Sequence, residues 1–243
     1  MDYVRWFSSV TGHREPHPWQ REFGASSECS DRLIRIPTGM GKTEGVLAAW
    51  AWHRLVRKDP SWPRRLVWCL PMRVLVEQTA AAARRLLERI REASPEEIPA
   101  VGIHLLMGGI ELEDWHLHPE KPAVLVGTQD MLLSRALNRG YAAGRARWPL
   151  EYGLLNHDCL WVMDEVQLMD VGLATSVQLQ AFRRERAGSA LRPCRTWWMS
   201  ATLQPEWLET IDSRPWLPEL RGAMLRIPPV ERTGPLWRVR KPL

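Results

Sequence analysis

Cysteine is scarce in this chain of 243 residues, which contains only Cys29, Cys69, Cys159 and Cys194. The four lie far apart in the sequence and form no Cys-x-x-Cys pair. A disulfide framework or a zinc site is therefore not expected, because both need cysteines in paired or closely spaced patterns. The pattern fits a reducing, cytoplasmic compartment better.

Long apolar runs are also lacking. No segment approaches the length of a membrane-spanning helix, and the residues after Met1 do not combine a basic start with the apolar core of a secretory signal. We therefore expect a soluble protein of the cytoplasm without a membrane partner.

Lysine is rare as well: only Lys42, Lys58, Lys121 and Lys241 occur, and arginine supplies the remaining positive charge. The net charge of +5 permits a polyanionic partner without requiring one, because the arginines are scattered along the chain. Hydrophobic residues make up 45% and charged residues 25%, which is the composition of a globular protein. The length suits one α/β domain, alone or with a short extension.

Short apolar runs alternate with longer segments of helical periodicity, a pattern typical of an α/β fold with a mostly parallel sheet and helices on both faces. The predicted strands are Leu33–Ile36, Leu66–Leu70, Val101–Leu105, Ala123–Val126, Leu160–Met163 and Thr196–Met199. The predicted helices are Glu44–Arg57, Val74–Ala93, Gln129–Asn138 and Ala174–Arg186.

The end of the chain has a different character. Thr202 is expected to cap a short helix that runs through Ile211, with Pro205 in its first turn. Residues 221–243 are proline-rich and aperiodic. We therefore predict a domain over residues 1–220 and a connector over residues 221–243 that leads toward a second domain absent from the chain.

The segment Pro37–Thr43 lies between a predicted strand and a predicted helix, the context of a phosphate-binding loop. Gly39 and Gly41 let backbone N–H groups close around phosphate oxygens, and the helix N-terminus adds its positive end. Lys42 would reach the β- and γ-phosphates, and the Thr43 hydroxyl would ligate magnesium. The alternative, a glycine-rich turn with one exposed lysine, does not account for the strand–helix context.

One position departs from the common phosphate loop. Three residues before Gly39, where another glycine is usual, the chain has Ile36. This favours a helicase-type loop over that of a GTPase or a small-molecule kinase.

Two carboxylates, Asp164 and Glu165, directly follow the predicted strand Leu160–Met163. Ligands bind at the carboxyl ends of strands in open α/β sheets. Asp164 is predicted to hold the magnesium ion of a nucleotide, and Glu165 to orient and deprotonate the attacking water. An acidic loop is the alternative for the pair alone, and the phosphate loop at a workable separation argues against it.

The segment Ser200–Thr202 follows another predicted strand and is expected at the same edge of the sheet. Its hydroxyl groups are expected to bond to the acidic motif and to relay its state to a neighbouring domain, so Ser200 and Thr202 are predicted coupling residues. By itself such a segment is usually a helix cap.

The motifs together resemble the first RecA-like domain of superfamily 2 DEAD/DEAH-like helicases. The resemblance rests on Gln20, Pro37–Thr43, Leu70–Thr79, Thr128–Leu133, Asp164–Gln167 and Ser200–Thr202. The more specific resemblance is to the CRISPR-associated helicase–nuclease of type I systems, nearest to the subtype called I-U or I-G. Its segments are Gly12–His13, Pro18–Gln20, Leu70–Arg73, His104–Gly109 and Asp164–Met169.

The resemblance implies roles for individual residues. Gln20 is similar to the glutamine that reads adenine, which favours ATP over GTP. The implied ATP site comprises Gln20, Thr38, Gly39, Met40, Gly41, Lys42 and Thr43. The catalytic set comprises Lys42, Asp164, Glu165 and Gln167, where related helicases often have histidine at the last position. The implied nucleic-acid contacts are Arg73, Gln78, Gly108, Gly109, Thr128 and Gln129.

The resemblance also implies partners: ATP and Mg²⁺ as cofactors, single-stranded DNA as the track, and a CRISPR surveillance complex that opens the target. A second RecA-like domain with an arginine finger, worth roughly 10³–10⁵-fold in turnover, is expected from elsewhere, as is an HD nuclease. The chain is therefore expected to be a fragment with weak activity in isolation. A non-catalytic nucleotide-binding or partner-docking module, or another superfamily 2 DNA or RNA helicase, stays open as an alternative.

Three features are predicted to be structural. His157–Asp158 has the dipeptide of HD nucleases but lacks a helical domain around it, so we interpret it as a turn. His116 and His118 are expected to lie in a solvated polar loop. Most of the fourteen tryptophans fall on predicted strands and helices and are expected in the core. Examples are Trp50, Trp52, Trp68, Trp161, Trp197 and Trp198.

Overall fold

The computed structural model describes residues 2–13, 15–93, 98–109, 115–141 and 143–228. Its centre is a seven-stranded sheet in the order β3-β4-β2-β5-β6-β1-β7, in which every strand pairing is parallel. The strands are β1 (Arg32–Arg35), β2 (Arg65–Leu70), β3 (Gly102–Leu106), β4 (Ala123–Thr128), β5 (Cys159–Asp164), β6 (Arg195–Ser200) and β7 (Leu225–Arg226). The predicted α/β class is confirmed.

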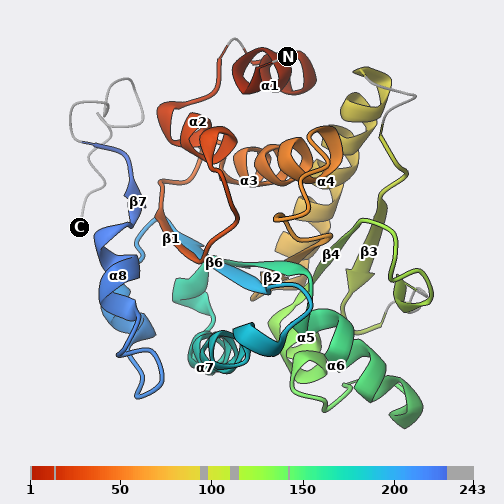
Figure 1. The fold of residues 1–243 in the computed structure, drawn as a ribbon, viewed down its shortest axis with the longest axis vertical. Coiled ribbons are helices and arrows are strands. Elements are labelled where there is room, and N and C mark those ends of the chain that lie inside the picture. The colour runs from red at the N-terminus through yellow and green to blue at the C-terminus, as the bar shows by residue number, and fades with distance from the viewer. Residues whose placement is uncertain (1, 14, 94–97, 110–114, 142, 229–243) are drawn as a thin grey trace.

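Helices cover both faces of the sheet, as Figure 1 shows. Those on one face are α1 (Tyr3–Thr11), α2 (Pro18–Ala25), α3 (Lys42–Ala51) and α4 (Arg73–Ala93). Those on the other are α5 (Gln129–Ala136), α6 (Trp148–Asn156) and α7 (Val171–Glu185), while α8 (Leu217–Gly222) contacts β1 and the 3-10 turn at Pro205–Leu208. In the described part of the chain, no helix is long and apolar enough to cross a membrane.

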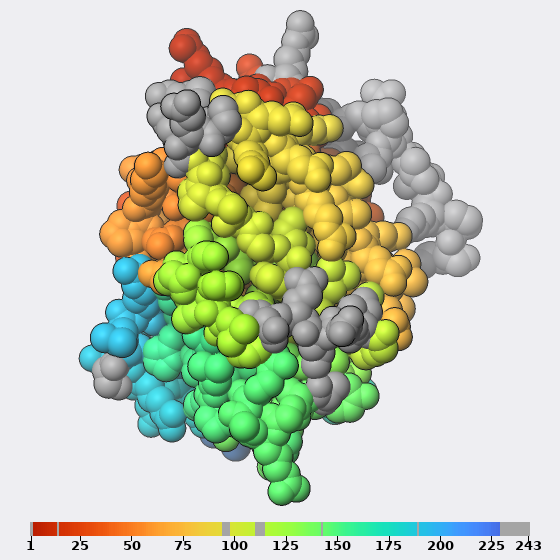
Figure 2. Space-filling view, turned by 90° about the vertical axis from the view of Figure 1, so that its right-hand side faces the viewer, coloured from red at the N-terminus to blue at the C-terminus, as the bar shows by residue number. Residues whose placement is uncertain are grey.

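Strand β3 forms one edge of the sheet. Figure 2 looks onto this side of the molecule, where α4, in yellow, lies above β3 and the green residues of α6 lie below it. The two helical layers therefore extend as far as the edge strand.

All six predicted strands are present, with ends shifted by at most two residues. The predicted helix over Glu44–Arg57 consists of α3 followed by a π-helical turn at Trp52–Val56. The helices α1, α2, α6 and α8 were not predicted. Each spans six to nine residues, about two turns, which is too short for a clear helical period in the sequence.

The end of the described chain differs from the sequence prediction. Thr202 caps no helix: the residues after it form a 3-10 turn at Pro205–Leu208 whose N-cap is Gln204, although Pro205 does occupy the first position. The helix does not continue to Ile211 because Glu209 has an extended backbone, with ψ of 113°, and Oγ of Ser213 donates to the backbone oxygen of Leu208 over 2.7 Å. Strand β7 pairs with β1, so the sheet includes two residues that the sequence assigned to the connector. The rest of that connector, from residue 229, lies outside the described residues.

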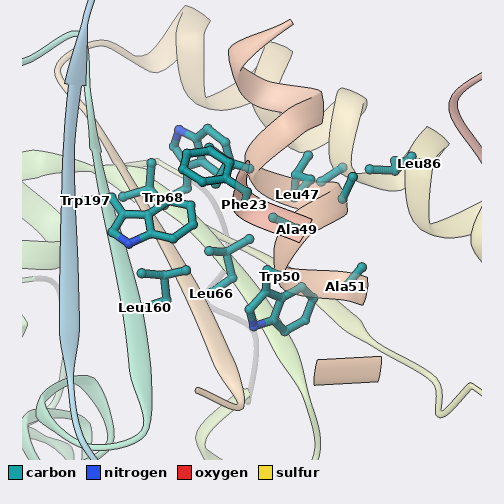
Figure 3. Packing of buried hydrophobic residues seen from close by; sticks show 14 of the residues in the cluster. Phe23, Leu47, Ala49, Trp50, Ala51, Leu66, Trp68, Leu86, Leu160 and Trp197 are labelled. Atoms are coloured by element: carbon teal, nitrogen blue, oxygen red, sulfur yellow. The ribbon is translucent and has the colours of Figure 1, made fainter. Parts of the chain in front are cut away.

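The core is rich in tryptophan, as the sequence predicts. Trp50, Trp68 and Trp197 are fully buried on the face under α3, where Figure 3 shows them with Phe23 from α2 and Leu160 from β5. Trp52, Trp161 and Trp198, also predicted in the core, are buried too. Such rings bury large apolar areas, so they fix the two helical layers on the sheet.

Candidate nucleotide-binding site

Because all strands are parallel, their carboxyl ends gather at one edge of the sheet, hereafter the carboxyl edge; the opposite one is the amino edge. Apart from the Gln20 motif on α2, each motif found in the sequence lies at or just after the end of a strand, at the carboxyl edge. Thr38, Arg73 and Gly108 come a few residues after β1, β2 and β3. Thr128, Asp164 and Ser200 are the last residues of β4, β5 and β6.

The loop from β1 to α3 has the geometry of a phosphate cradle. Gly39 and Gly41 adopt left-handed conformations, with φ of 85° and 71°, which side chains at these positions would strain. Lys42 is the first residue of α3, so the open N–H groups of the first helical turn face the loop. Thr38 and Gly39 are exposed, and Met40, Gly41 and Thr43 are half-buried.

Lys42 is brought to the acidic motif across 123 residues of sequence. Its side chain is buried, and Nζ lies 3.4 Å from Oε1 of Glu165. The second oxygen of Glu165, Oε2, accepts a hydrogen bond of 2.6 Å from Nε2 of Gln167. Glu165 has a left-handed backbone with φ of 53°, a conformation that is uncommon without glycine and that occurs at functional sites.

Asp164 is buried beside this pair. Its Oδ2 accepts a hydrogen bond of 3.2 Å from the indole Nε1 of Trp68, and its Oδ1 accepts one of 2.9 Å from the backbone N–H of Glu165. Burial raises the pKa of Asp164 to about 6; the Lys42 ammonium opposes this shift and the Glu165 carboxylate adds to it. Asp164 is therefore a largely dehydrated carboxylate whose charged form gains from a nearby cation.

Trp68 was predicted as a core residue only, and its bond to Asp164 was missed. The tryptophan lies on β2, which pairs with β5, and in this register it stands opposite Val162. A bond of this kind depends on strand pairing between distant segments, which no local sequence signal encodes.

Gln20, from α2, contacts the phosphate loop directly. It is buried, its Nε2 donates to the backbone oxygen of Gly41 over 3.1 Å, and its Oε1 accepts from the backbone N–H of His17 over 2.8 Å. The close approach requires glycine in α3, since a Cβ at Gly45 would come within 2.9 Å of Gln20 and 2.7 Å of Trp19. Gly45 and Trp19 were not among the predicted site residues.

Ser200 and Thr202 form a local turn. The backbone N–H of Thr202 donates to Oγ of Ser200 over 3.0 Å, and the two hydroxyl oxygens lie 3.4 Å apart. In this structure their hydrogen bonds, among the residues described, join the two to each other and not to the acidic motif.

Of the predicted nucleic-acid contacts, Arg73 and Gly109 come together. Both are exposed, and a Cβ at Gly109 would lie 3.7 Å from Nη1 of Arg73. Gln78 is exposed on α4, Gly108 is half-buried, and Thr128 is the N-cap of α5. The structure therefore unites an arginine and a glycine turn at the carboxyl edge, from segments that follow β2 and β3.

Gln129 points to a different neighbour. Its amide oxygen would lie 2.3 Å from a Cβ on Gly172, in the first turn of α7, and this oxygen is buried with no hydrogen-bond donor among the described residues. The side chain packs against the helix that follows the acidic motif, a placement that the sequence did not predict.

The residues fit a nucleotide with magnesium. The left-handed glycines Gly39 and Gly41 shape the loop at the start of α3, and Lys42 provides a buried cation. The raised pKa of the buried Asp164 means that a further cation would stabilise its charged form. No group of three or more His, Cys, Asp and Glu side chains able to hold a metal ion occurs among the described residues. Mg²⁺ is usually held by one or two protein groups together with phosphates, which matches a site of Thr43 and Asp164.

The two histidine segments are accounted for by structure. His157 and Asp158 form a bend before β5, as predicted, and Oδ1 of Asp158 accepts a hydrogen bond from the backbone N–H of Arg64. His118 is exposed, but His116 is buried and lies 3.0 Å from Nη2 of Arg147. The solvated loop expected there is therefore wrong for His116, because its ring packs under Arg147.

Fold and site together define a P-loop NTPase domain of the RecA-like kind. A family model described as DEAD/DEAH box helicase matches residues 20–211, and the chain belongs to this family. No curated protein sequence matches the chain.

Solved structures show the same fold at low sequence identity. Mss116p bound to ssRNA and AMP-PNP is similar with a TM-score of 0.54 and 17% identity, over 85% of this chain and 39% of that one. The DUF1998 helicase MrfA bound to DNA gives 0.60 and 14%, over 86% and 27%. The yeast DEAD-box splicing factor Prp28 gives 0.55 and 19%, over 84% and 45%. The chain thus spans less than half the length of these helicases.

Proposed function

We propose that this chain is the ATP-binding motor domain of a superfamily 2 helicase that couples ATP hydrolysis to movement along single-stranded DNA. The observation that carries the proposal is the contact of 3.4 Å between Nζ of Lys42 and Oε1 of Glu165. It joins the phosphate loop and the acidic motif, which are 123 residues apart, at one edge of the sheet.

Each side chain of this site has a task that its surroundings support. Lys42 binds phosphate oxygens, and in doing so it gives up part of its pair with Glu165, which leaves Oε1 available for the attacking water. Glu165 then orients this water and accepts its proton, while Gln167 holds the other carboxylate oxygen. Gln20 supports the loop through Gly41 and lies where an adenine-reading glutamine is expected.

Thr43 and Asp164 are the groups that would hold magnesium. The ion would supply positive charge that neutralises the charge developing on the phosphate oxygens. Trp68 keeps Asp164 in place through the indole N–H, so the carboxylate does not turn away from the loop. The hydroxyl groups of Ser200, the last residue of the adjacent strand β6, and of Thr202, two residues further on, are proposed to relay the state of this site to a neighbouring domain.

The nucleic-acid side of the proposal rests on Arg73 and on the turn at Gly108 and Gly109. Their exposed groups lie at the carboxyl edge, where a phosphate backbone binds an arginine and close backbone N–H groups. Gln78, Thr128 and Gln129 are proposed as further contacts. The bound nucleic acids in the structures of Mss116p and MrfA, ssRNA and DNA, make either polymer a reasonable probe.

The biological setting is proposed from the motifs. The resemblance of Gly12–His13, His104–Gly109 and Asp164–Met169 to the type I CRISPR-associated helicase–nuclease favours single-stranded DNA exposed by a surveillance complex. A second RecA-like domain, with its arginine, is proposed to complete the site from outside this chain, because an arginine finger raises turnover by roughly 10³–10⁵-fold. The chain alone is then expected to hydrolyse ATP slowly.

The test compares ATP hydrolysis by the full chain with single-stranded DNA and with RNA of the same sequence. We expect slow hydrolysis that DNA stimulates more than RNA, and stronger stimulation by DNA opened by a type I surveillance complex. If RNA stimulated hydrolysis as strongly as DNA, the result would point to another superfamily 2 helicase.

A variant of the catalytic glutamate separates an enzyme from a binding module. Glu165→Gln is expected to keep ATP binding and to lose about 10²–10⁴-fold in hydrolysis, because the amide accepts no proton from water. Glu185→Gln, at the exposed end of α7, is the matched control and should behave like the parent chain. Unchanged hydrolysis in Glu165→Gln would favour a non-catalytic nucleotide-binding module.

A further inference from the structure

Two cysteines that are far apart in sequence are neighbours at the amino edge of the sheet. Leu160 of β5 stands opposite Arg195, the first residue of β6, in a parallel register. Extended by one residue, this register brings Cys159, the first residue of β5, opposite Cys194, which directly precedes β6. Neighbouring strands lie about 4.8 Å apart, and disulfides join Cα atoms that are usually about 4.4–6.8 Å apart. The backbone spacing therefore suits a disulfide.

The two thiols point to the same face of the sheet. Both belong to the buried cluster under α5, α6 and α7, and both reach the last turn of α6. Sγ of Cys159 lies 3.1 Å from the backbone oxygen of Leu154, and Sγ of Cys194 lies 3.8 Å from that of Leu155. Adjacent carbonyl groups of one helix thus hold the two sulfur atoms beside each other.

A cavity of about 340 Å³ opens next to the pair. Cys194 forms part of its wall together with Phe182, Arg183 and His157. Cys159 is fully buried and Cys194 is only 5% exposed, so large molecules do not reach the pair from the surface. The cavity wall at Cys194 is the route by which a small molecule reaches the two sulfur atoms.

The surroundings favour a thiolate on one of the two sulfurs. Burial alone raises the pKa of Cys159, but the hydrogen bond from Cys194 and the guanidinium groups of Arg65 and Arg183 outweigh it and lower the pKa to about 7. Burial and the proton that it shares with Cys159 raise the pKa of Cys194. The remaining cysteines, Cys29 and Cys69, are buried with raised pKa values and stay as inert thiols.

We propose that Cys159 and Cys194 form an oxidisable dithiol, open to small peroxides through the adjacent cavity, that closes to an intramolecular disulfide. The four cysteines are free in this structure, which corresponds to the reduced form. The proposal is independent of the nucleotide site, which lies at the opposite edge of the sheet.

The chemistry balances with one peroxide for each pair. The Cys159 thiolate attacks one oxygen of hydrogen peroxide, the O–O bond breaks, and the departing hydroxide takes a proton to leave as water. The Cys194 thiol then attacks the sulfur of the resulting sulfenic acid, the S–O bond breaks, and a second water leaves with the thiol proton. Two thiols are oxidised by two electrons, and the peroxide is reduced to two waters.

The test treats the full native chain with hydrogen peroxide and counts free thiols after denaturation. We expect two of the four thiols to disappear, with peptide mapping that links Cys159 to Cys194 within one copy, and we expect dithiothreitol to restore them. Cys29→Ala and Cys69→Ala are the matched controls and should still lose two thiols. Full retention of four thiols, a link through Cys29 or Cys69, or links between copies would each overturn the proposal.

The variants Cys159→Ser and Cys194→Ser should form no internal disulfide. Cys194→Ser should trap a sulfenic acid on Cys159, whereas Cys159→Ser should resist oxidation at Cys194, because burial raises the pKa of that thiol. A second measurement needs no variant: limited alkylation of the native chain with iodoacetamide at pH 7. Cys159 should react at least about tenfold faster than Cys29 and Cys69, because a pKa near 7 leaves about half of this thiol ionised. Equal rates at all four cysteines would contradict the proposal even if the serine variants failed to fold.

Discussion

The carboxyl edge of the sheet is built from loops, and the amino edge from the first residues of strands and the last turns of helices. At the carboxyl edge, Gly39, Lys42 and Glu165 stand on turns that directly follow a strand, so a short stretch of sequence contains each motif. At the amino edge, the pair of Cys159 and Cys194 exists only because two strands run side by side in one register. Local motifs thus reveal the chemistry of one edge, and only the fold reveals that of the other.

The largest expected effect tests whether ATP is hydrolysed at the carboxyl edge. Lys42→Ala removes the cation beside Glu165 and should lower ATP turnover by about 10²–10³-fold, the usual cost of losing one group that stabilises developing charge. Hydrolysis is measured with single-stranded DNA present. Lys121→Ala, at an exposed position just before β4 on the amino edge, is the matched control and should leave turnover unchanged. Equal losses in both variants would break the distinction between the edges.

A buried carboxylate offers the next largest effect, on stability. The pKa of Asp164 is raised from 3.8 to about 6, so the folded state binds its proton more readily than the unfolded chain between these values. Below about pH 4 the side chain of Asp164 is neutral in both states and does not destabilise the fold. As the pH rises through about 6, the folded protein must hold a buried charge, and its free energy of unfolding falls. Asp164→Asn should then be more stable than the parent chain at pH 7.5 by about 2–3 kcal/mol, although magnesium-dependent ATP binding is lost.

Urea unfolding at pH 7.5 and at pH 4.5 checks this expectation. The gain should shrink at the lower pH, where the parent aspartic acid is itself mostly neutral. A gain that is the same at both values would mean that charge is not its cause. If Asp164→Asn is more stable than the parent chain but inactive, the charged Asp164 destabilises the fold and is retained for its function.

What the sequence could predict follows the same division. The glycines at 39 and 41, the lysine after them and the two carboxylates each answer a local chemical need, and their order along the chain was enough to place them at one edge. The six strands of buried aliphatic and tryptophan residues were found as well, because parallel strands buried on both faces have near-continuous apolar runs.

The remaining features depend on contacts between distant segments. Trp68 holds Asp164 only because β2 lies beside β5, and Gln129 faces Gly172 only because α5 packs on α7. Helix α2 lasts eight residues, too few for its period to show, although Pro18 at its start is a recognisable signal. None of these contacts can be predicted from a pattern in a single sequence.

The contact between Gln129 and Gly172 provides a sharper test at the carboxyl edge. Gly172→Ala places a Cβ 2.3 Å from Oε1 of Gln129, so the side-chain amide must move. The variant should lose about 1 kcal/mol, in place of the gain of about 0.5–1 kcal/mol that alanine normally brings in a helix. Gly153→Ala, in α6 with nothing near its Cβ position, is the control and should gain about 0.5–1 kcal/mol.

The double variant Gly172→Ala with Gln129→Ala distinguishes a steric clash from another cause. If the clash is responsible, Gly172→Ala should cost clearly less stability in the Gln129→Ala background than in the parent chain. Chemical unfolding of all four forms measures this difference. Full additivity of the two changes would show that Gln129 does not wedge against α7. DNA binding by Gln129→Ala, measured in parallel, reports whether the side chain also contacts nucleic acid.

The smallest expected effect tests whether the amino edge contributes to stability without affecting ATP binding. Oγ1 of Thr196 donates to Oε1 of Gln180 over 2.7 Å, and Nε2 of Gln180 donates to the buried Asp31 over 2.9 Å. Thr196→Val keeps the shape but leaves the Gln180 oxygen without a donor, so unfolding should become easier by about 1 kcal/mol. ATP affinity should not change, because Thr196 lies four residues before Ser200 along β6, a separation of roughly 13 Å. Weaker ATP binding in this variant, at unchanged stability, would mean that the two edges are coupled through β6, and the division between them would have to be abandoned.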